Sequence, residues 1–271
     1  MNDDFAITLS LDELLALLDL LGFASMNGLP PNPLAGVPKK QQEQRLQAGL
    51  QSLQRRGLAT QTGEVVVLDD ALTALVTSCL RPAASLVLVG RLPDGTEDVH
   101  LFNVTPDIRV EHSFTHLDSH TFCFFARDAT LQARVHEVLR PLETAAQPDA
   151  FAGVWPWRLL NEVIAQARGG REDKAIKALN KARWPQPEAE AFAAAVARWP
   201  VYTAVYAWDL HSTPIGGQQT VMIVADRRRC WLLNSQDTAT QDLTVRAVAG
   251  STAVKAILAL AQSLATVAET S

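Results

Sequence analysis

The apolar residues near the start of the chain recur with helical spacing, and helix start and stop signals bracket them. Ser10 and Glu13 have the spacing of a capping box, and a helix is predicted from Leu11 to Gly22, where glycine is a typical stop. This helix is apolar on most faces, so we expect it to pack deeply. After a Pro- and Gly-rich loop over residues 27–38, a second helix is predicted from about Lys40 to Arg56. Its buried stripe comprises Leu46, Leu50 and Leu53.

The period of the pattern then changes from helical to strand-like. Residues 57–68 predict a small hairpin that turns at Thr62-Gly63, and Asp69-Asp70 caps a helix over 71–80. The alternation of period two that follows predicts consecutive strands joined by short turns, and a helix over 130–139 closes this half. The four predicted strands are Ser85–Arg91, Asp98–Val104, Ile108–Thr115 and Thr121–Ala126.

The same order of elements returns after a predicted linker over 147–153. Helices are expected at 156–167, 171–182 and 187–197, and a last helix runs over 251–267. Three or four strands are expected between them, at Tyr202–Leu210, Thr220–Ala225, Cys230–Asn234 and Leu243–Val248. The pattern predicts an α+β fold of two quasi-twofold halves, 1–146 and 147–271, in one compact unit. Short turns between neighbouring strands indicate antiparallel sheets with helices packed on one face.

Composition agrees with a globular chain and weighs against one class of partner. The 271 residues are 48% hydrophobic and 20% charged, and the net charge is −5. Residues 1–146 carry 18 acidic and 11 basic side chains, a net of −7, whereas residues 147–271 carry 11 and 13, a net of +2. Because nucleic-acid binding needs a basic face, a nucleic-acid partner is unlikely on this balance.

The cysteines and the apolar runs indicate a cytoplasmic protein. Cys79, Cys123 and Cys230 form neither a disulfide framework nor a zinc motif, so we expect buried thiols. The acidic segment Met1–Asp4 is unlike a signal peptide, and no apolar run approaches the roughly 20 residues that span a bilayer. We therefore expect no membrane insertion.

No set of residues predicts a catalytic, cofactor or metal site. His112, His116 and His120 are spaced four apart, which on a helix would align three metal ligands. Their context is strand, turn and strand, so surface or half-buried histidines are the favoured interpretation, although His112 and His120 could meet across the hairpin. No Gly-x-Ser-x-Gly elbow or phosphate loop is present, and the chain is not expected to be an enzyme.

Two kinds of residue pairs have ordinary structural explanations. The glycine pairs Gly169-Gly170 and Gly216-Gly217 are expected in turns and not around a cofactor. The acidic pairs Asp69-Asp70 and Glu172-Asp173 stand at predicted helix starts, where their charge favours the helix dipole.

Two basic groups and the tryptophans each leave two interpretations open. Arg171, Lys174, Lys177 and Lys181 share one helix face, either as a solvated surface or as a docking stripe for an acidic partner. The arginines at 227–229 form a predicted hairpin tip. Their charge either protects the neighbouring apolar strands from aggregation or binds an anion. The six tryptophans either pack the core and junction of the second half or include interface anchors. They are Trp155, Trp157, Trp184, Trp199, Trp208 and Trp231.

The segment from Gln42 to Leu80 has the order helix, two-stranded wing and helix, which is typical of a winged helix. The first of these helices carries Arg45, Arg55 and Arg56 but also an acidic residue and several glutamines. The hairpin, residues 60–64, has no basic residue that could contact phosphate. A winged-helix shape that does not bind DNA is the favoured interpretation.

Several of these segments together resemble the EspG family of cytosolic accessory proteins of type VII (ESX) secretion. The early helix before Leu29-Pro30 and the strand over 243–248 that leads into the helix 253–264 are similar to that family. The other matching segments are Leu53–Leu58, Gly63–Val65, Leu72–Leu75 and Arg81–Leu88. The resemblance covers most of the chain through apolar spacing and a Gly-Leu turn.

The resemblance implies a central β-sheet flanked by helical bundles and a chaperone that binds the tips of helical PE–PPE secretion substrates. On this basis we expect a non-enzymatic factor that shields an apolar helical surface of a protein partner. By analogy alone, the candidate contacts are the strand 203–210, the loop 212–219 and the second-half helices, and no individual binding residue is assigned. The alternative is a winged-helix transcriptional regulator with a ligand-sensing α/β part.

Overall fold

The first half of the chain interposes three helices and a hairpin between its first strand and the rest of its strands. The computed structural model describes residues 5–144, 151–208, 210, 217–235 and 242–270. The first-half elements are β1 (Phe5–Ser10), α1 (Leu11–Leu20), α2 (Lys39–Arg55), β2 (Ala59–Thr62), β3 (Val65–Leu68), α3 (Asp70–Leu80), β4 (Ala84–Arg91), β5 (Glu97–Val104), β6 (Arg109–Phe114), β7 (Ser119–Phe125), α4 (Asp128–Leu139) and the 3-10 helix η1 (Arg140–Thr144).

The second half repeats this order without the hairpin. Its elements are β8 (Ala152–Pro156), α5 (Trp157–Arg168), α6 (Glu172–Lys181), α7 (Gln186–Arg198), β9 (Val201–Trp208), β10 (Gly217–Ala225), β11 (Cys230–Ser235), β12 (Asp242–Val248) and α8 (Gly250–Thr270). Each half thus runs from a strand through three helices and four strands of the large sheet to a closing helix, and the order from the helices onward is the one that the sequence predicts.

Ten of the described strands form one antiparallel sheet in the order β1-β7-β6-β5-β4-β9-β10-β11-β12-β8. The first half supplies the first five strands and the second half the last five. The halves meet where β4 pairs with β9, with Leu86 opposite Tyr206. Counted outward from this pair, corresponding strands of the two halves occupy corresponding places. The predicted α+β class with a central antiparallel sheet is confirmed.

Both edge strands of this sheet are absent from the prediction. At one edge β1 pairs with β7, and at the other β8 pairs with β12. The predicted linker over 147–153 therefore overlaps a strand that begins at Ala152, and the following helix begins at Trp157. Glycine and proline weaken strand propensity at β8, and the pairing with β12 overrides that local preference.

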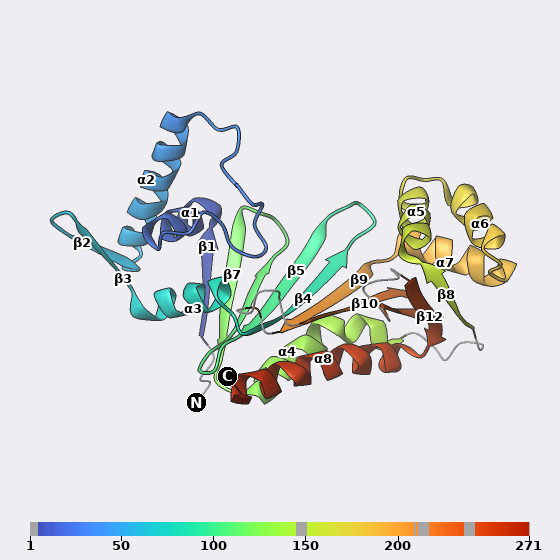
Figure 1. Ribbon diagram of the computed structural model, residues 1–271. Coiled ribbons are helices and arrows are strands. Elements are labelled where there is room, and N and C mark those ends of the chain that lie inside the picture. Colours follow the sequence, from blue (N-terminus) through green and yellow to red (C-terminus); the bar gives the residue numbers. More distant parts are fainter. Residues whose placement is uncertain (1–4, 145–150, 209, 211–216, 236–241, 271) are drawn as a thin grey trace.

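Helices cover both faces of the sheet, which corrects the expectation of helices on one face. In Figure 1, α4 and α8 run side by side along one face of the sheet. Buried side chains from both halves, among them Leu86, Phe102, Ile223 and Ile257, join these helices to the strands in one core cluster. Because successive residues of a strand point to opposite faces, the residues between these face the other side.

The other face carries one helical bundle at each end (Figure 1). Near β1, α1 to α3 pack in a cluster that includes Leu17 and Phe122, and near β8, α5 to α7 pack around Phe192 and Trp231. The predicted capping box begins the first bundle, because Glu13 N–H donates to Ser10 Oγ over 3.2 Å and Ser10 N–H donates to Glu13 Oε2 over 2.8 Å. No described helix combines the length and apolar character needed to cross a membrane.

Candidate functional site

A groove lies on the bundle-bearing face of the sheet, over its central strands. We call it the central groove, and it encloses about 620 Å³. Its floor is apolar, because the outward-facing residues of β4, β5 and β9 are mostly valine, leucine and alanine. The floor residues are Val87, Val89, Val99, Leu101, Val205 and Ala207, with Ser85 and Leu210 toward one end and Glu97 toward the other. Val87 and Val205 are only half-buried although they stand on adjacent central strands.

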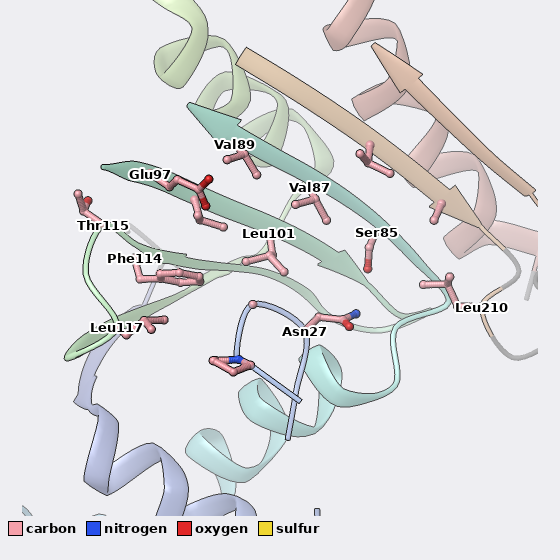
Figure 2. Close-up of a pocket in the computed structure, with 15 residues that line it drawn as sticks. Asn27, Ser85, Val87, Val89, Glu97, Leu101, Phe114, Thr115, Leu117 and Leu210 are labelled. Carbon is pink, nitrogen blue, oxygen red and sulfur yellow. The ribbon is translucent and has the colours of Figure 1, made fainter. Parts of the chain in front are cut away.

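The wall of the groove on the side of the first bundle comes from the loop after α1 and the turn after β6. Figure 2 shows Asn27 on this loop near the strands, with Phe114 and Leu117 on the same side of the groove. Gly28 adopts a φ of +92°, and a Cβ there would lie 2.9 Å from a ring carbon of Phe114. The close packing of this loop on the β6 side chains therefore requires glycine.

Two of the predicted candidate histidines meet behind this wall. His112 Nε2 lies 3.0 Å from His120 Nδ1, and both side chains are fully buried, whereas His116 is exposed. Burial and the neighbouring His120 lower the pKa of His112 to about 3, so the ring is neutral at neutral pH. The expectation that His112 and His120 are surface or half-buried is wrong, and their meeting across the hairpin is confirmed.

The histidine pair does not form a metal site within the described part of the chain, where no three side chains of His, Cys, Asp or Glu gather as ligands. Phe122 stacks on His112 with 4.5 Å between ring centroids, and His120 Nε2 lies 2.9 Å from the carbonyl oxygen of Leu117. The pair therefore packs the hairpin that supports the groove wall.

Two polar side chains of the groove, Ser85 and Glu97, have partners within the protein. Ser85 Oγ donates to Asn103 Oδ1 over 2.6 Å, and both side chains are buried. Glu97 is engaged by Arg91, whose Nε lies 2.7 Å from Glu97 Oε1. Because most of its lining residues are apolar, the groove is suited to holding an apolar surface.

A buried ionic network lies under the opposite face of the sheet and was not predicted. His100 Nδ1 is 2.6 Å from Glu111 Oε1, and Arg134 of α4 donates to Glu111 Oε2 over 2.9 Å. Burial raises the pKa of Glu111, but hydrogen bonds and charge from His100 and Arg134 outweigh it and lower the pKa overall. The network joins β5, β6 and α4, and it fixes this helix to the sheet.

The described residues of the predicted glycine and acidic pairs lie at the ends of helices, except that Gly217 belongs to a strand. Gly169 and Gly170 end α5, and Asp69 Oδ1 accepts the N–H of Leu72 as the cap of α3. Glu172 and Asp173 occupy the first turn of α6. Gly216 lies outside the described residues. Gly217 is the first residue of β10 and not part of a turn. The ring of Trp208 fills the space that a side chain at this position would need, so the strand favours glycine here.

The predicted basic groups are on the surface of the second half. Arg171, Lys174, Lys177 and Lys181 are exposed along α6, while Ala175 and Leu179 pack inward. At the tip of the β10–β11 hairpin, Arg229 pairs with Glu188 over 2.9 Å. In the same turn the guanidinium of Arg227 lies 5.5 Å from the ring centre of Trp199. Two of the three arginines thus have protein partners, which favours a structural role for this tip.

The tryptophans mostly build the second bundle. Trp231 and Trp184 are buried, and Trp155, Trp184, Phe192 and Trp231 form a chain of contacts with ring centres about 5 Å apart. Trp155, Trp157, Trp199 and Trp208 are half-buried. Packing of the core explains Trp184 and Trp231, and the interface interpretation stays a prediction for the half-buried rings.

The strand proposed by analogy as a contact lies in the centre of the sheet. Thr203 to Trp208 belong to β9, where Val205 and Ala207 form part of the groove floor. Of the loop 212–219, residues 212–216 lie outside the described residues and residues 217–219 belong to β10. Among the second-half helices, α5 approaches the groove side of the sheet through Trp157 and Ile164.

Sequence patterns did not identify the groove wall. Asn27, Gly28 and Pro30 were assigned to a loop by their turn-forming character alone. The alternation in β4 does contain a usable signal, because Ser85, Val87 and Val89 alternate with buried Ala84, Leu86 and Leu88. A strand that is apolar on both faces indicates burial on both, and only the positions of the bundles show that one face stays open.

The whole fold is similar to that of a known secretion chaperone. No protein-family model and no curated protein sequence matches the chain. Among solved structures, the fold matches that of the Mycobacterium tuberculosis type VII secretion system chaperone EspG5, solved in complex with a PE25–PPE41 dimer. The TM-score is 0.61 at 11% sequence identity, over 96% of this chain and 95% of EspG5. The match shows a shared fold and a distant structural relationship.

Proposed function

We propose that this protein is a non-enzymatic chaperone that binds an apolar helical surface of a secretion protein in the central groove. The observation that carries the proposal is the uncovered apolar floor between the two bundles, with Val87 and Val205 half-buried on adjacent central strands. Exposed apolar areas of this kind commonly mark sites where a partner or ligand binds. A partner would cover it and gain the free energy of that burial.

A helix is the favoured form of the partner. The groove floor is a continuous apolar strip across β5, β4 and β9, and an amphipathic helix presents a matching apolar stripe with its own backbone hydrogen bonds satisfied. The likeness to EspG5, which was solved with a PE25–PPE41 dimer, supports a protein partner of the secretion type. The expected location is the cytoplasm, where such a partner would be bound before export.

The alternative of a DNA-binding regulator finds little support in the charges of the winged-helix-like segment. Arg45 of α2 pairs with Asp12 over 2.6 Å, and Arg56 pairs with Glu13 over 2.9 Å, so α1 neutralises both. The exposed face of the hairpin carries Thr60, Val65 and Val67. A phosphate backbone would meet few free cations on this surface.

Photo-cross-linking in the native host tests the partner. A cross-linking residue at Val205 should capture a helical secreted protein, and the same residue at exposed Val65 should not capture it. The captured partner is then titrated against a double variant, Val87→Thr with Val205→Thr, which keeps shape and strand propensity but lowers apolarity. We expect affinity to fall about tenfold or more.

The matched control is Val65→Thr with Val67→Thr, which changes two exposed valines of the hairpin in the same way. Its affinity should equal that of the unmodified protein. Capture of a protein that is neither helical nor secreted, or a loss confined to the hairpin variant, contradicts the proposal. Salt-dependent DNA binding in a mobility-shift assay would instead support the regulator.

A further inference from the structure

A second, smaller cavity opens beside the central groove, between α5 and the sheet. We call it the side pocket, and it encloses about 290 Å³. Val89 and Glu97 line both cavities, so the two lie next to each other. The side pocket is lined by both apolar and polar residues. Its apolar lining comprises Val89, Trp157, Ile164, Val201 and Met222, and its polar lining comprises Arg91, Glu97, Asn161, Arg168 and Thr203.

The charges of the side pocket are unbalanced. Arg168, at the end of α5, donates to the carbonyl oxygens of Leu92 and Arg91 over 2.8 and 2.7 Å. These acceptors are neutral, and Arg168 Nε is buried with no partner among the described residues. Glu97 is the carboxylate of the described lining, and it is already paired with Arg91. The described lining thus holds two guanidinium groups and one carboxylate.

The electrostatic environment of Arg168 agrees with this shortage of negative charge. Burial and the positive charge of Arg91 lower the pKa of Arg168, and Glu97 acts in the opposite direction. The guanidinium stays charged at neutral pH, because arginine does not lose its proton in proteins under such conditions. An anion bound between Arg91 and Arg168 would reduce the repulsion between their positive charges.

We propose that the side pocket binds a carboxylate attached to an apolar group, and that its occupant is an acidic side chain of the partner segment held in the central groove. The apolar lining around Trp157 would receive the hydrocarbon portion, and Arg91 and Arg168 would attract the carboxylate. The two cavities are neighbours at Val89 and Glu97, so one bound segment would be near enough to reach both. The identity of the occupant rests on the proposed function, whereas the preference for a carboxylate does not.

Two small probes of nearly equal shape test the carboxylate preference in the intact protein. These are 4-phenylbutyrate, which carries a carboxylate, and 4-phenylbutyramide, which carries a neutral amide. Binding is followed by NMR through the indole N–H of Trp157 and the side-chain amide of Asn161. We expect the carboxylate to bind at least about threefold more tightly than the amide, in line with the modest value of exposed ion pairs.

Two charge variants of half-exposed residues move the preference in opposite directions. Glu97→Gln removes the competing carboxylate and should strengthen 4-phenylbutyrate binding about threefold, and Arg91→Gln should weaken it by a similar factor. The amide probe should bind equally well to both. Glu64→Gln, at the exposed hairpin turn, is the matched charge control and should change neither probe.

The results separate this inference from the proposed function. Equal binding of the two probes, or no change of their ratio in Glu97→Gln and Arg91→Gln, overturns the carboxylate site. A co-purifying organic acid detected by native mass spectrometry overturns the assignment of the occupant to a partner side chain. If the probes behave as expected and Val205 cross-links no secreted protein, the carboxylate preference stands and the chaperone proposal fails.

Discussion

At the scale of single residues, His112 shows how burial converts an ordinary side chain into a pH-dependent element of stability. Its folded pKa is lowered to about 3 by burial and by His120, while in the unfolded chain it titrates near 6.5. The unfolded state therefore binds more protons below pH 6.5, and the free energy of unfolding should fall as the pH falls toward 3.

The contribution of His112 is measured by comparing urea unfolding of the protein and of His112→Phe at several pH values between 7 and 5. Phenylalanine retains the stacking on Phe122 and removes the titrating nitrogen. The variant should lose less stability per unit of pH, with the difference approaching about 1.4 kcal/mol per unit below the unfolded pKa. Parallel curves for the two proteins would show that His112 takes up its proton equally well in both states.

At the scale of elements, the crossing of α1 and α2 depends on the absence of a side chain at Gly49. A Cβ there would lie 2.0 Å from the carbonyl oxygen of Asp12, a distance no real contact reaches. The ion pair between Arg45 and Asp12 and the hydrogen bond of 2.7 Å from Ser52 to Glu13 hold the helices together on either side. The helices therefore cannot separate locally without losing these bonds.

Gly49→Ala should destabilise the protein by about 1–3 kcal/mol, because the added methyl group overpacks the crossing. The sign is diagnostic, since alanine in place of glycine stabilises an exposed helix position by up to about 1 kcal/mol. The midpoint of urea unfolding measures the change. Gln47→Ala, at an exposed position of the same helix, is the control and should be neutral or slightly stabilising. A higher midpoint for Gly49→Ala would mean that the helices cross at a larger distance.

At the scale of the whole molecule, the two halves share a core and a sheet. The cluster under α4 and α8 contains Leu86 and Phe102 of the first half together with Ile223 and Ile257 of the second. The contacts of α8 extend to β4 and β5 as well as to β9, β10 and β11. Separation at residue 146 would expose this cluster and leave β4 and β9 unpaired.

We expect residues 1–146 and 147–271, produced separately, to lack cooperative urea unfolding, while the complete chain unfolds in a single transition. Circular dichroism and dispersion of NMR amide signals measure the difference. Co-expression of the two pieces is the control and should restore the cooperative transition. Cooperative unfolding of either piece alone, at the stability of the whole chain, would establish two independent domains.

The sequence by itself determined the elements whose signals are local. The capping box at Ser10, the cap at Asp69 and the alternation in β4 to β7 predict their helices and strands because each depends on neighbours a few residues away. The order of the two halves follows from these elements. The sequence also shows that both faces of β4 are apolar, but it does not show that one of these faces stays open as a groove.

Only the tertiary structure decided the features that depend on pairing between distant segments. The edge strands β1 and β8 exist because β7 and β12 supply their hydrogen bonds, and the burial of His112 beside His120 depends on the hairpin and the loop at Gly28. The central groove depends on where two bundles stand on one face of the sheet. Local propensity cannot specify such placements, because they arise from packing between residues far apart along the chain.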